Sequence, residues 1–255
     1  MSDIVLSRDA GVLSICFNRP HKKNAITAAM YQALADAIKE GEADPAVRVM
    51  LFAGSTEVFT AGNDLEDFRD HPPQGENSPV FRFLYAIAHA KKPFIAAVAG
   101  PAVGIGTTML LHCEAVYAGD NAKFVLPFAA LGLCPEAASS LLLPAIAGYQ
   151  RAAEKLLFGE PFGAEEAREM GIVNQVLPAA ELLAHAQARA KKLAQMPASS
   201  VRVTKALMRG AQIKAVEAQS AEELAHFRKM LGSPEAKEAF AAFFERRKPD
   251  FSQFA

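Results

Sequence analysis

Residues 94–108 read FIAAVAGPAVGIGTT, an apolar run that leads directly into a glycine-rich turn. The run at 94–100 is short and continuous, which is typical of a strand buried on both faces of a sheet. Two further runs, at 49–54 (VMLFAG) and 115–118 (AVYA), have the same character. Helical patterns at about 79–90 and 106–112 separate these runs. Short buried strands that alternate with helices predict an α/β fold with right-handed crossovers.

Further strands and helices are expected on both sides of this central region. Residues 12–17 (VLSICF) predict a strand, and Thr27 is a suitable N-cap for a helix over 28–42. After about residue 195 the pattern is helical and more charged, which predicts helices at 199–210, 215–231 and 234–247. We therefore divide the chain into a core, residues 1–195, and a helical C-terminal region, residues 196–255. We expect the polar loop 70–78 (DHPPQGENS) to be mobile.

Composition narrows the class of protein. The chain has 255 residues, of which 27 are basic and 28 acidic. It therefore lacks the excess of basic residues that is typical of nucleic-acid-binding proteins. The three cysteines fit no zinc or redox spacing, and we expect a reducing, cytoplasmic setting with no bound metal. The N-terminus lacks the features of a signal peptide. Glycine and proline interrupt the most apolar stretch, 93–111, so no membrane span is predicted.

Two glycine-rich turns, at 59–65 (FTAGNDL) and 99–108 (AGPAVGIGTT), each join a predicted strand to a helical pattern. Glycine lets a backbone approach a ligand closely. The start of a helix leaves N–H donors free and favours negative charge. Two such turns that face each other could hold one oxyanion. The alternative is that the glycines only permit tight turns and close packing of helix on strand.

Ten motifs in a fixed order extend this comparison over nearly the whole chain: 18–20 (NRP), 23–26 (KNAI), 59–65 (FTAGNDL), 100–106 (GPAVGIG), 122–124 (AKF), 127–128 (PF), 131–132 (LG), 167–174 (AREMGIVN), 204–209 (TKALMR) and 246–251 (RRKPDF). In their order and spacing the sequence resembles the crotonase (enoyl-CoA hydratase/isomerase) superfamily. The resemblance implies a spiral of repeated ββα units with a helical C-terminal region, assembled as a homotrimer or a dimer of trimers. It also implies a pocket for an acyl-CoA thioester, with coenzyme A present only as part of the substrate.

The resemblance assigns the oxyanion donors to two backbone N–H groups, those of Asn63 and Ile105. Ile105 stands where the family usually has glycine. The backbone alone is needed at this position, although a side chain there could crowd the acyl group.

The resemblance also implies a binding site for the CoA moiety. Lys22 or Lys23 would meet the CoA phosphates, and backbone near Thr60 and Ala61 would meet the adenine. Asp64 follows the first oxyanion turn, and we expect it to cap or orient that loop beside the CoA. The alternative for both lysines is an ordinary solvated charge.

Two residues indicate which reaction of the family is expected. The hydratases of the family use two glutamates, and in this sequence those positions are Thr108 and Phe128, in the expected acyl pocket. Neither side chain is a carboxylate, and Phe128 has no polar atom to hold water. Hydration by the usual route of the family is therefore not expected.

A different acid, Glu136, lies in residues 133–140 (LCPEAASS), at the start of a helical pattern. A helix dipole alone favours an acid there. The resemblance, however, places Glu136 where Δ3,Δ2-enoyl-CoA isomerases of the peroxisomal kind carry their catalytic acid. Apolar neighbours such as Leu126 and Leu133 would desolvate it and favour its neutral form.

We predict from this an isomerase in which Glu136 moves a double bond from C3 to C2 of an enoyl-CoA. One alternative is another crotonase reaction, such as hydration or thioester hydrolysis, at the same oxyanion site. The other is a catalytically inactive acyl-CoA-binding protein. His112 and Cys113 are interpreted as a buried structural pair, because no other ligand residue joins them at metal-binding spacing.

Overall fold

The centre of the molecule is a six-stranded sheet in the computed structural model, which describes residues 2–70, 75 and 77–254. In order across the sheet the strands are β1 (Ile4–Asp9), β2 (Val12–Phe17), β3 (Val49–Ala53), β4 (Phe94–Val98), β6 (Ala115–Gly119) and β9 (Gln175–Leu177). β1 pairs with β2 antiparallel, and the other neighbours pair parallel. The predicted α/β class and the strands expected from apolar runs are confirmed.

A second, smaller sheet contains β5 (Pro101–Val103), β7 (Lys123–Val125) and β8 (Phe162–Gly163). A single bridge between Thr60 and Ala102 extends it. The chain therefore passes from β4 to β5 and then into a helix, and β6 is followed by β7 in the same way. These successive strand pairs followed by helix are the ββα units that the resemblance implies.

Gly100 allows the chain to change sheets after β4. Its φ is +62°, in the left-handed region, and a Cβ there would lie 1.8 Å from the carbonyl oxygen of Glu57. Only glycine fits such a backbone conformation with a neighbour this close. The glycine after the central apolar run is thus required by the fold, whatever else the turn does.

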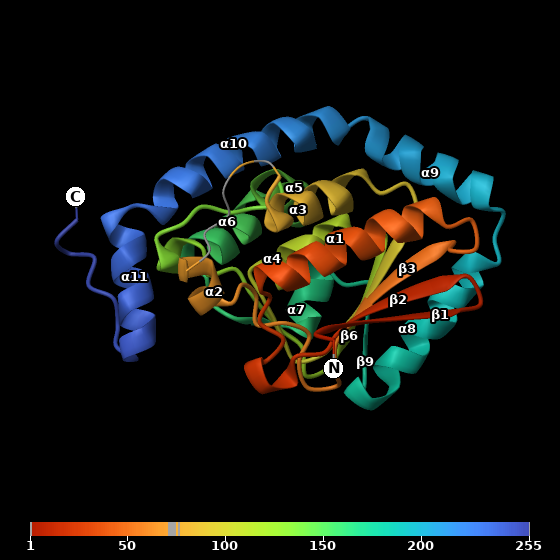
Figure 1. Cartoon of the computed structure of the whole chain (residues 1–255), viewed down its shortest axis with the longest axis horizontal. Coiled ribbons are helices and arrows are strands. Elements are labelled where there is room, and N and C mark those ends of the chain that lie inside the picture. The colour runs from red at the N-terminus through yellow and green to blue at the C-terminus, as the bar shows by residue number, and fades with distance from the viewer. Residues whose placement is uncertain (1, 71–74, 76, 255) are drawn as a thin grey trace.

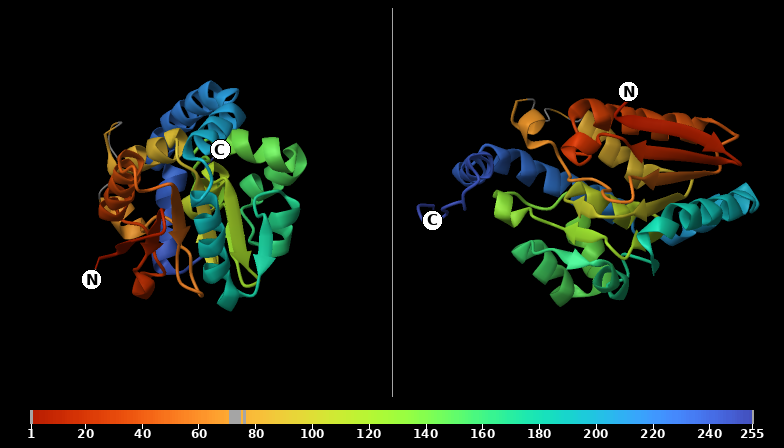
Figure 2. Two further views of the ribbon diagram at one scale, coloured as in Figure 1. Left: turned by 90° about the vertical axis from the view of Figure 1, so that its right-hand side faces the viewer. Right: turned by 90° about the horizontal axis from the view of Figure 1, so that it is seen from below.

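Helices cover both faces of the main sheet (Figures 1 and 2). α1 (Ala28–Ala43) and α3 (Pro79–His89) belong to one face, where the largest hydrophobic cluster lies. α8 (Ala179–Ala194) covers the other face and packs Leu182 and Ala186 against β3 and β4. Helices α1 and α3 confirm the prediction. The alanine-rich α8 was not predicted, because its apolar stripe consists mainly of small side chains.

Three C-terminal helices form an arc over one side of the core, blue in Figure 1. They agree with the predicted ranges and are α9 (Ala198–Gly210), α10 (Ile213–Leu231) and α11 (Pro234–Glu245). Lys205 of α9 is buried, and its Nζ donates to the carbonyl oxygen of Lys92 at 2.8 Å and to Glu114 at 3.0 Å. The expected boundary at residue 195 falls between α8 and α9. The division of the chain into a core and a helical region for trimer contacts or a lid stays a prediction.

The remaining helices are short: η1 (Pro20–Lys22), α2 (Leu65–Asp70), α4 (Ile105–Thr108), η2 (Met109–His112), η3 (Ala129–Leu131), α5 (Ser139–Ala147), α6 (Tyr149–Phe158) and α7 (Ala164–Glu169). The helix expected at 106–112 is divided between α4 and the 3-10 turn η2. Most of the loop expected to be mobile, 71–74 and 76, lies outside the described residues. Among the described helices, none has the length and apolar character needed to cross a membrane.

Candidate active site

The two glycine-rich turns lie against each other. The backbone N–H of Val103 donates to the carbonyl oxygen of Thr60 at 3.0 Å. Gly62 has φ +82°, and a Cβ there would lie 2.7 Å from the carbonyl oxygen of Val103. The structure thus brings together the two segments that were predicted to form one oxyanion site.

Two backbone N–H groups are free in this place. Among the described residues, no group accepts a hydrogen bond from the N–H of Asn63 or of Ile105. Ile105 is the first residue of α4, where an N–H has no acceptor within the helix. Its side chain is buried in the main hydrophobic cluster. The free donors support the predicted oxyanion role, which stays a prediction.

The residues expected to bind CoA come together beside the first turn. The N–H of Ala61 donates to the carbonyl oxygen of Lys23 at 2.9 Å, and Thr60 Oγ1 donates to that of Asn24 at 2.7 Å. Lys22 is exposed and lies 3.2 Å from Glu66 Oε2. The two lysines and the turn thus form one surface, and their contact with CoA stays a prediction.

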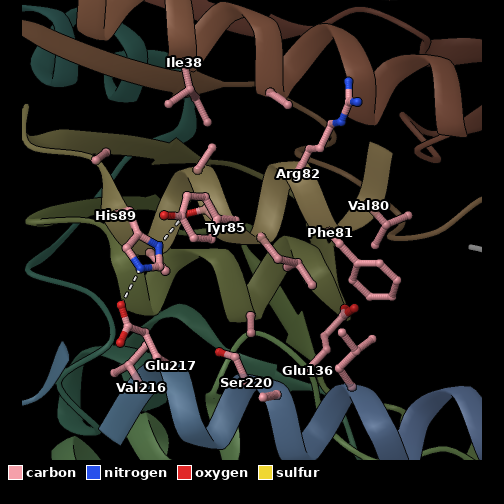
Figure 3. A pocket seen from close by; sticks show the side chains of 18 of the residues that line it. Ile38, Val80, Phe81, Arg82, Tyr85, His89, Glu136, Val216, Glu217 and Ser220 are labelled. Carbon is pink, nitrogen blue, oxygen red and sulfur yellow. Dashed lines mark hydrogen bonds and ion pairs between the residues drawn. The ribbon is translucent and has the colours of Figure 1, made fainter. Parts of the chain in front are cut away.

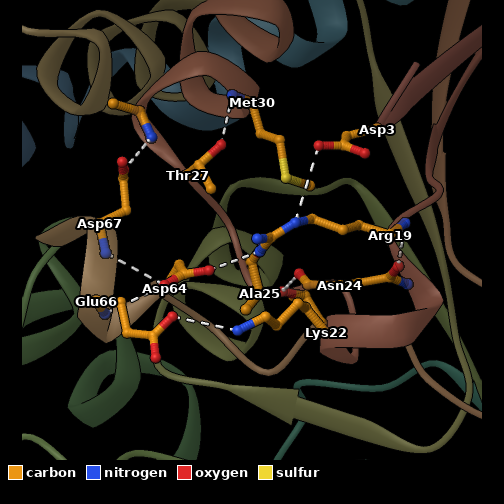
Figure 4. A network of polar contacts seen from close by, with 12 residues as sticks. Asp3, Arg19, Lys22, Asn24, Ala25, Thr27, Met30, Asp64, Glu66 and Asp67 are labelled. Atoms are coloured by element: carbon orange, nitrogen blue, oxygen red, sulfur yellow. Dashed lines mark hydrogen bonds and ion pairs between the residues drawn. The ribbon is translucent and has the colours of Figure 1, made fainter. Parts of the chain in front are cut away.

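Asp64 orients the loop after the first turn (Figure 4). Its Oδ1 accepts hydrogen bonds from the N–H groups of Glu66 and Asp67, and its Oδ2 lies 2.6 Å from Nη1 of Arg19. Burial would raise the pKa of Asp64, but these hydrogen bonds and the charge of Arg19 lower it overall. The expected capping role is confirmed at the start of α2. Contact between Asp64 and CoA stays a prediction.

Glu136 lies in a loop and not at the start of a helix. The interpretation of Glu136 as an acid in the first turn of a helix is wrong, because α5 begins only at Ser139. Ala137 and Ala138 intervene with φ of +60° and +54°, in the left-handed region, which is incompatible with a continuous α-helix. The helix dipole therefore does not explain this acid.

Burial dominates the chemistry of Glu136. The residue is only 6% exposed, and among the described residues no group hydrogen-bonds to its Oε1. Burial, and next the charge of Glu223, raise the pKa of Glu136 to about 8. A carboxyl group that is easily protonated at neutral pH and has a free oxygen is suited to general acid–base chemistry.

Glu136 forms part of the wall of a cavity of about 940 Å³ between α1, α3 and α10. Figure 3 shows Glu136 near Val80 and Phe81, well away from His89 and Glu217, whose Nε2 and Oε1 atoms lie 2.8 Å apart at the other side of the cavity. Most of the lining between them is apolar. Such a space fits a hydrocarbon chain better than it fits a charged group.

Thr108 and Phe128 are both buried, as expected for an acyl pocket. Neither lines the cavity that contains Glu136, so their contact with the acyl group stays a prediction. His112 is also buried, and its Nε2 lies 2.8 Å from the carbonyl oxygen of Ala137. Burial lowers the pKa of His112 to about 4, so it is neutral. The predicted burial of His112 is confirmed, whereas Cys113 is partly buried, and the structural role of the pair stays a prediction.

The sequence did not indicate two further residues. Tyr31 of α1 donates a short hydrogen bond to Asn63 Oδ1, and its pKa is raised by burial and then by the charge of Glu136. Tyr31 therefore contacts the first oxyanion turn and is influenced by the charge of the acid. Glu223 of α10 binds the chain next to Glu136. Both lie on helices that the sequence predicts, but no local motif singles them out.

Comparison with known proteins identifies the family to which this chain belongs. The sequence model of the enoyl-CoA hydratase/isomerase family matches residues 7–254. A solved enoyl-CoA hydratase/isomerase structure from Pseudoalteromonas atlantica T6c is 42% identical with a TM-score of 0.94, covering 98% of this chain and 100% of that chain. The chain belongs to the enoyl-CoA hydratase/isomerase family. The crotonase-like fold is thereby confirmed.

Relatives within the enoyl-CoA hydratase/isomerase family differ in reaction. Enoyl-CoA delta isomerase 2 of Rattus norvegicus is 37% identical over 250 residues, which are 96% of this chain and 64% of the rat protein. This chain thus spans less than two thirds of that relative. The 2,3-dehydroadipyl-CoA hydratase of Escherichia coli K12 is 32% identical over 252 residues, 98% of this chain and 99% of the hydratase. Membership of the family therefore does not choose between isomerisation and hydration.

Proposed function

We propose that this protein is an enoyl-CoA isomerase that moves a double bond from C3 to C2 of its substrate. The observation that supports this best is Glu136, a buried carboxyl group with one free oxygen at an apolar cavity. One such base is sufficient for isomerisation if it reaches both C2 and C4. The free N–H groups of Asn63 and Ile105 supply the second requirement, an oxyanion site.

In the proposed reaction, the carboxylate of Glu136 removes a proton from C2 of the 3-enoyl thioester. The electron pair of that C–H bond forms a bond between C1 and C2, and negative charge moves to the thioester oxygen. Hydrogen bonds from Asn63 and Ile105 stabilise this dienolate. As the thioester carbonyl re-forms, the C3–C4 double bond takes the proton from Glu136 at C4. The new double bond lies between C2 and C3.

The environment of Glu136 supports its role as a base. A carboxylate with a pKa near 8 binds a proton more strongly than one at the ordinary value of 4.5, which assists removal of a proton from carbon. The neutral acid that results is then favoured by the apolar surroundings. The same group can therefore hold the proton between its removal from C2 and its return to C4.

Hydration is the second candidate, because the family relatives include hydratases. It would need a water held between two carboxylates, and Thr108 and Phe128 stand where the resemblance puts those acids. Phe128 is buried and apolar. A non-catalytic acyl-CoA-binding protein is the third candidate. Glu136 argues against it, because among the described residues its Oε1 has no hydrogen-bond partner, and burying such a group lowers the stability of the fold without benefit to a protein that only binds.

We place the acyl chain in the cavity between α1, α3 and α10, and the CoA over Lys22, Lys23, Thr60 and Ala61. Most of the side chains that line this cavity with Glu136 are apolar. We also propose a cytoplasmic setting, with which three free thiols, Cys16, Cys113 and Cys134, are compatible.

An absorbance assay with several acyl-CoA substrates tests the proposal. With 3-hexenoyl-CoA, the purified protein is expected to form the conjugated 2-enoyl thioester. Consumption of 2-enoyl-CoA with water, and no reaction with 3-hexenoyl-CoA, would establish hydration instead. Measurable binding of acyl-CoA without any turnover would identify a binding protein. Repeating the assay over several chain lengths defines the substrate.

A further inference from the structure

A buried acid of helix α10, Glu223, contacts the loop that carries Glu136. We propose that Glu223 is a positioning residue for the reaction: it fixes this loop and holds a second negative charge beside the base. This inference rests on the proposed function, since it assigns Glu136 as the base. Glu223 lines the cavity proposed for the acyl chain, and its assigned role is exerted through Glu136 and its loop.

Glu223 binds the chain on the C-terminal side of Glu136. Its Oε2 accepts a hydrogen bond from the N–H of Ala138 at 2.7 Å. Its Oε1 accepts one from the N–H of Ser140 at 3.0 Å and another from the Ser140 hydroxyl. Gln219, one helical turn earlier on α10, donates from Nε2 to Ser140 Oγ at 3.0 Å. The first N–H groups of α5 are thus capped from another helix.

These contacts hold a backbone that is unfavourable by itself. Ala137 and Ala138 both have positive φ, which residues with a Cβ seldom adopt. Such conformations persist where surrounding structure determines them, often at functional sites. On one side His112 Nε2 contacts the carbonyl oxygen of Ala137, and on the other Glu223 accepts from Ala138. The direction of the Glu136 side chain depends on this pair of alanines.

Glu223 also supplies charge. Four titratable groups surround the position of Glu136: Tyr31 of α1, on which the charge of Glu136 acts; His112 of η2, which contacts the carbonyl oxygen of the adjoining Ala137; Cys134 of the same loop; and Glu223 of α10. The first three are neutral at physiological pH, because burial raises the pKa of the tyrosine and the thiol and lowers that of the histidine. Within the described residues, Glu223 is therefore the charged group that acts on Glu136.

The two buried acids are not equivalent. Burial raises the pKa of Glu223 as well, but its three hydrogen bonds stabilise the charged form and offset part of that rise, whereas Oε1 of Glu136 has no partner among the described groups. Glu223 therefore loses its proton first as the pH rises. Its charge then disfavours a second negative charge nearby, so that Glu136 keeps its proton to higher pH.

The substitution Glu223→Gln tests this role, because it removes the charge and keeps the size. In the pH profile of kcat for 3-hexenoyl-CoA, we expect the acid limb to move down by about one pH unit. The plateau value of kcat should fall about tenfold, because the base is weaker and its loop is held less firmly. KM is expected to change much less than kcat.

Two matched variants separate charge from structure. Glu223→Asp keeps the charge, and its acid limb should stay near that of the wild type even if kcat falls. Ser140→Ala removes one hydrogen bond and leaves both acids, so its limb should also stay in place. A Glu223→Gln profile that keeps the wild-type limb would overturn the proposal, whether or not kcat falls, because Glu223 would then be merely structural.

A measurement on the wild-type protein keeps the proposal testable if Glu223→Gln does not fold. Carboxyl carbon NMR of protein labelled at glutamate, assigned with Glu136→Gln, should show Glu223 titrating at lower pH than Glu136. The reverse order would overturn the inference. Because this titration needs no substrate, it stands apart from the proposed function. Absence of isomerase activity in the wild type with every 3-enoyl-CoA would instead remove the proposed function.

Discussion

Glu136 has to be both buried and, during the reaction, ionised. Burial disfavours the charged form and raises the pKa of Glu136 to about 8. This value is still low enough for a fraction of the groups to ionise near neutral pH. Such a group is mostly neutral at pH 7 and becomes a strong base when it ionises. The activity of this site should therefore depend on pH in a range where ordinary carboxylates do not titrate.

The pH profile of the wild-type enzyme follows from this pKa. The reaction needs Glu136 ionised, so kcat/KM for 3-hexenoyl-CoA should rise about tenfold per unit up to about pH 7 and level off above about pH 9. Initial rates over this range measure it. A flat profile between pH 5 and 9 would show that the base is an acid of ordinary pKa.

Glu136 should also lower the stability of the fold at high pH. Since its pKa is raised on folding, its stabilising contribution is fully present below the unfolded value near 4.5 and is lost as the pH rises through about 8. Glu136→Gln is therefore expected to have a higher Tm than the wild type at pH 9, with a smaller difference at pH 5. Thermal unfolding at both pH values measures this.

The control for that experiment is Glu181→Gln, at an exposed position of α8. Its Tm should match that of the wild type at both pH values. If Glu136→Gln were less stable than the wild type at pH 9, the buried acid would have to be ionised and stabilised by a partner.

At the residue scale, the sequence located Glu136 through a resemblance of motifs and not through its surroundings. Its place before α5 depends on two alanines with positive φ, which no local pattern indicates. Glu223 was missed because its contacts with Ala138 and Ser140 join distant parts of the chain. Long-range hydrogen bonds of this kind have no signature within a sequence window.

At the scale of elements, continuous apolar runs predicted the central strands correctly. β1 was not predicted because five of its six side chains face solvent at the edge of the sheet. The strands of the second sheet have two or three residues each, and pairing with neighbours defines them more than propensity does. The C-terminal helices were predicted, and so was their docking on the core or on another subunit, because isolated helices need a packing partner. The residues that make the docking contacts, such as Lys205, were not predicted.

Lys205 should be important for the docking of α9, since it is buried and hydrogen-bonded to Glu114 and to the backbone of Lys92. Lys205→Met removes the positive charge and leaves Glu114 with Arg209 as its remaining ionic partner. Breaking a buried ion pair typically lowers the free energy of unfolding by about 3 kcal/mol or more. Chemical denaturation measures this loss.

The matched control is Lys191→Met, which removes the exposed pair between Lys191 and Asp9. Exposed pairs contribute at most about 1 kcal/mol, so this variant should resemble the wild type. Equal effects of the two substitutions would show that Lys205 does not anchor α9.

At the scale of the whole molecule, α6 leaves large apolar side chains in contact with solvent. Tyr149, Leu157 and Phe158 are 72%, 68% and 70% exposed. An isolated chain seldom exposes such residues together, and they indicate a surface for association. The homotrimer or dimer of trimers expected from the resemblance would provide a place to bury them.

Sedimentation equilibrium tests this assembly. The wild-type protein is expected to have three or six times the mass of the 27.3 kDa chain. The double variant Leu157→Glu with Phe158→Glu should reduce that mass, because charges at an apolar interface oppose association. A monomeric wild-type protein would contradict the expected assembly, and an unchanged mass in the variant would place the interface elsewhere.

The rate of isomerisation in Glu136→Gln tests the central claim most directly. The amide has the size of the acid but cannot take a proton from C2, so formation of the conjugated product from 3-hexenoyl-CoA should fall by more than about 100-fold. Binding of acyl-CoA should persist, and Glu181→Gln should retain the wild-type rate. Turnover by Glu136→Gln at a rate close to that of the wild type would contradict the assignment of Glu136 as the base.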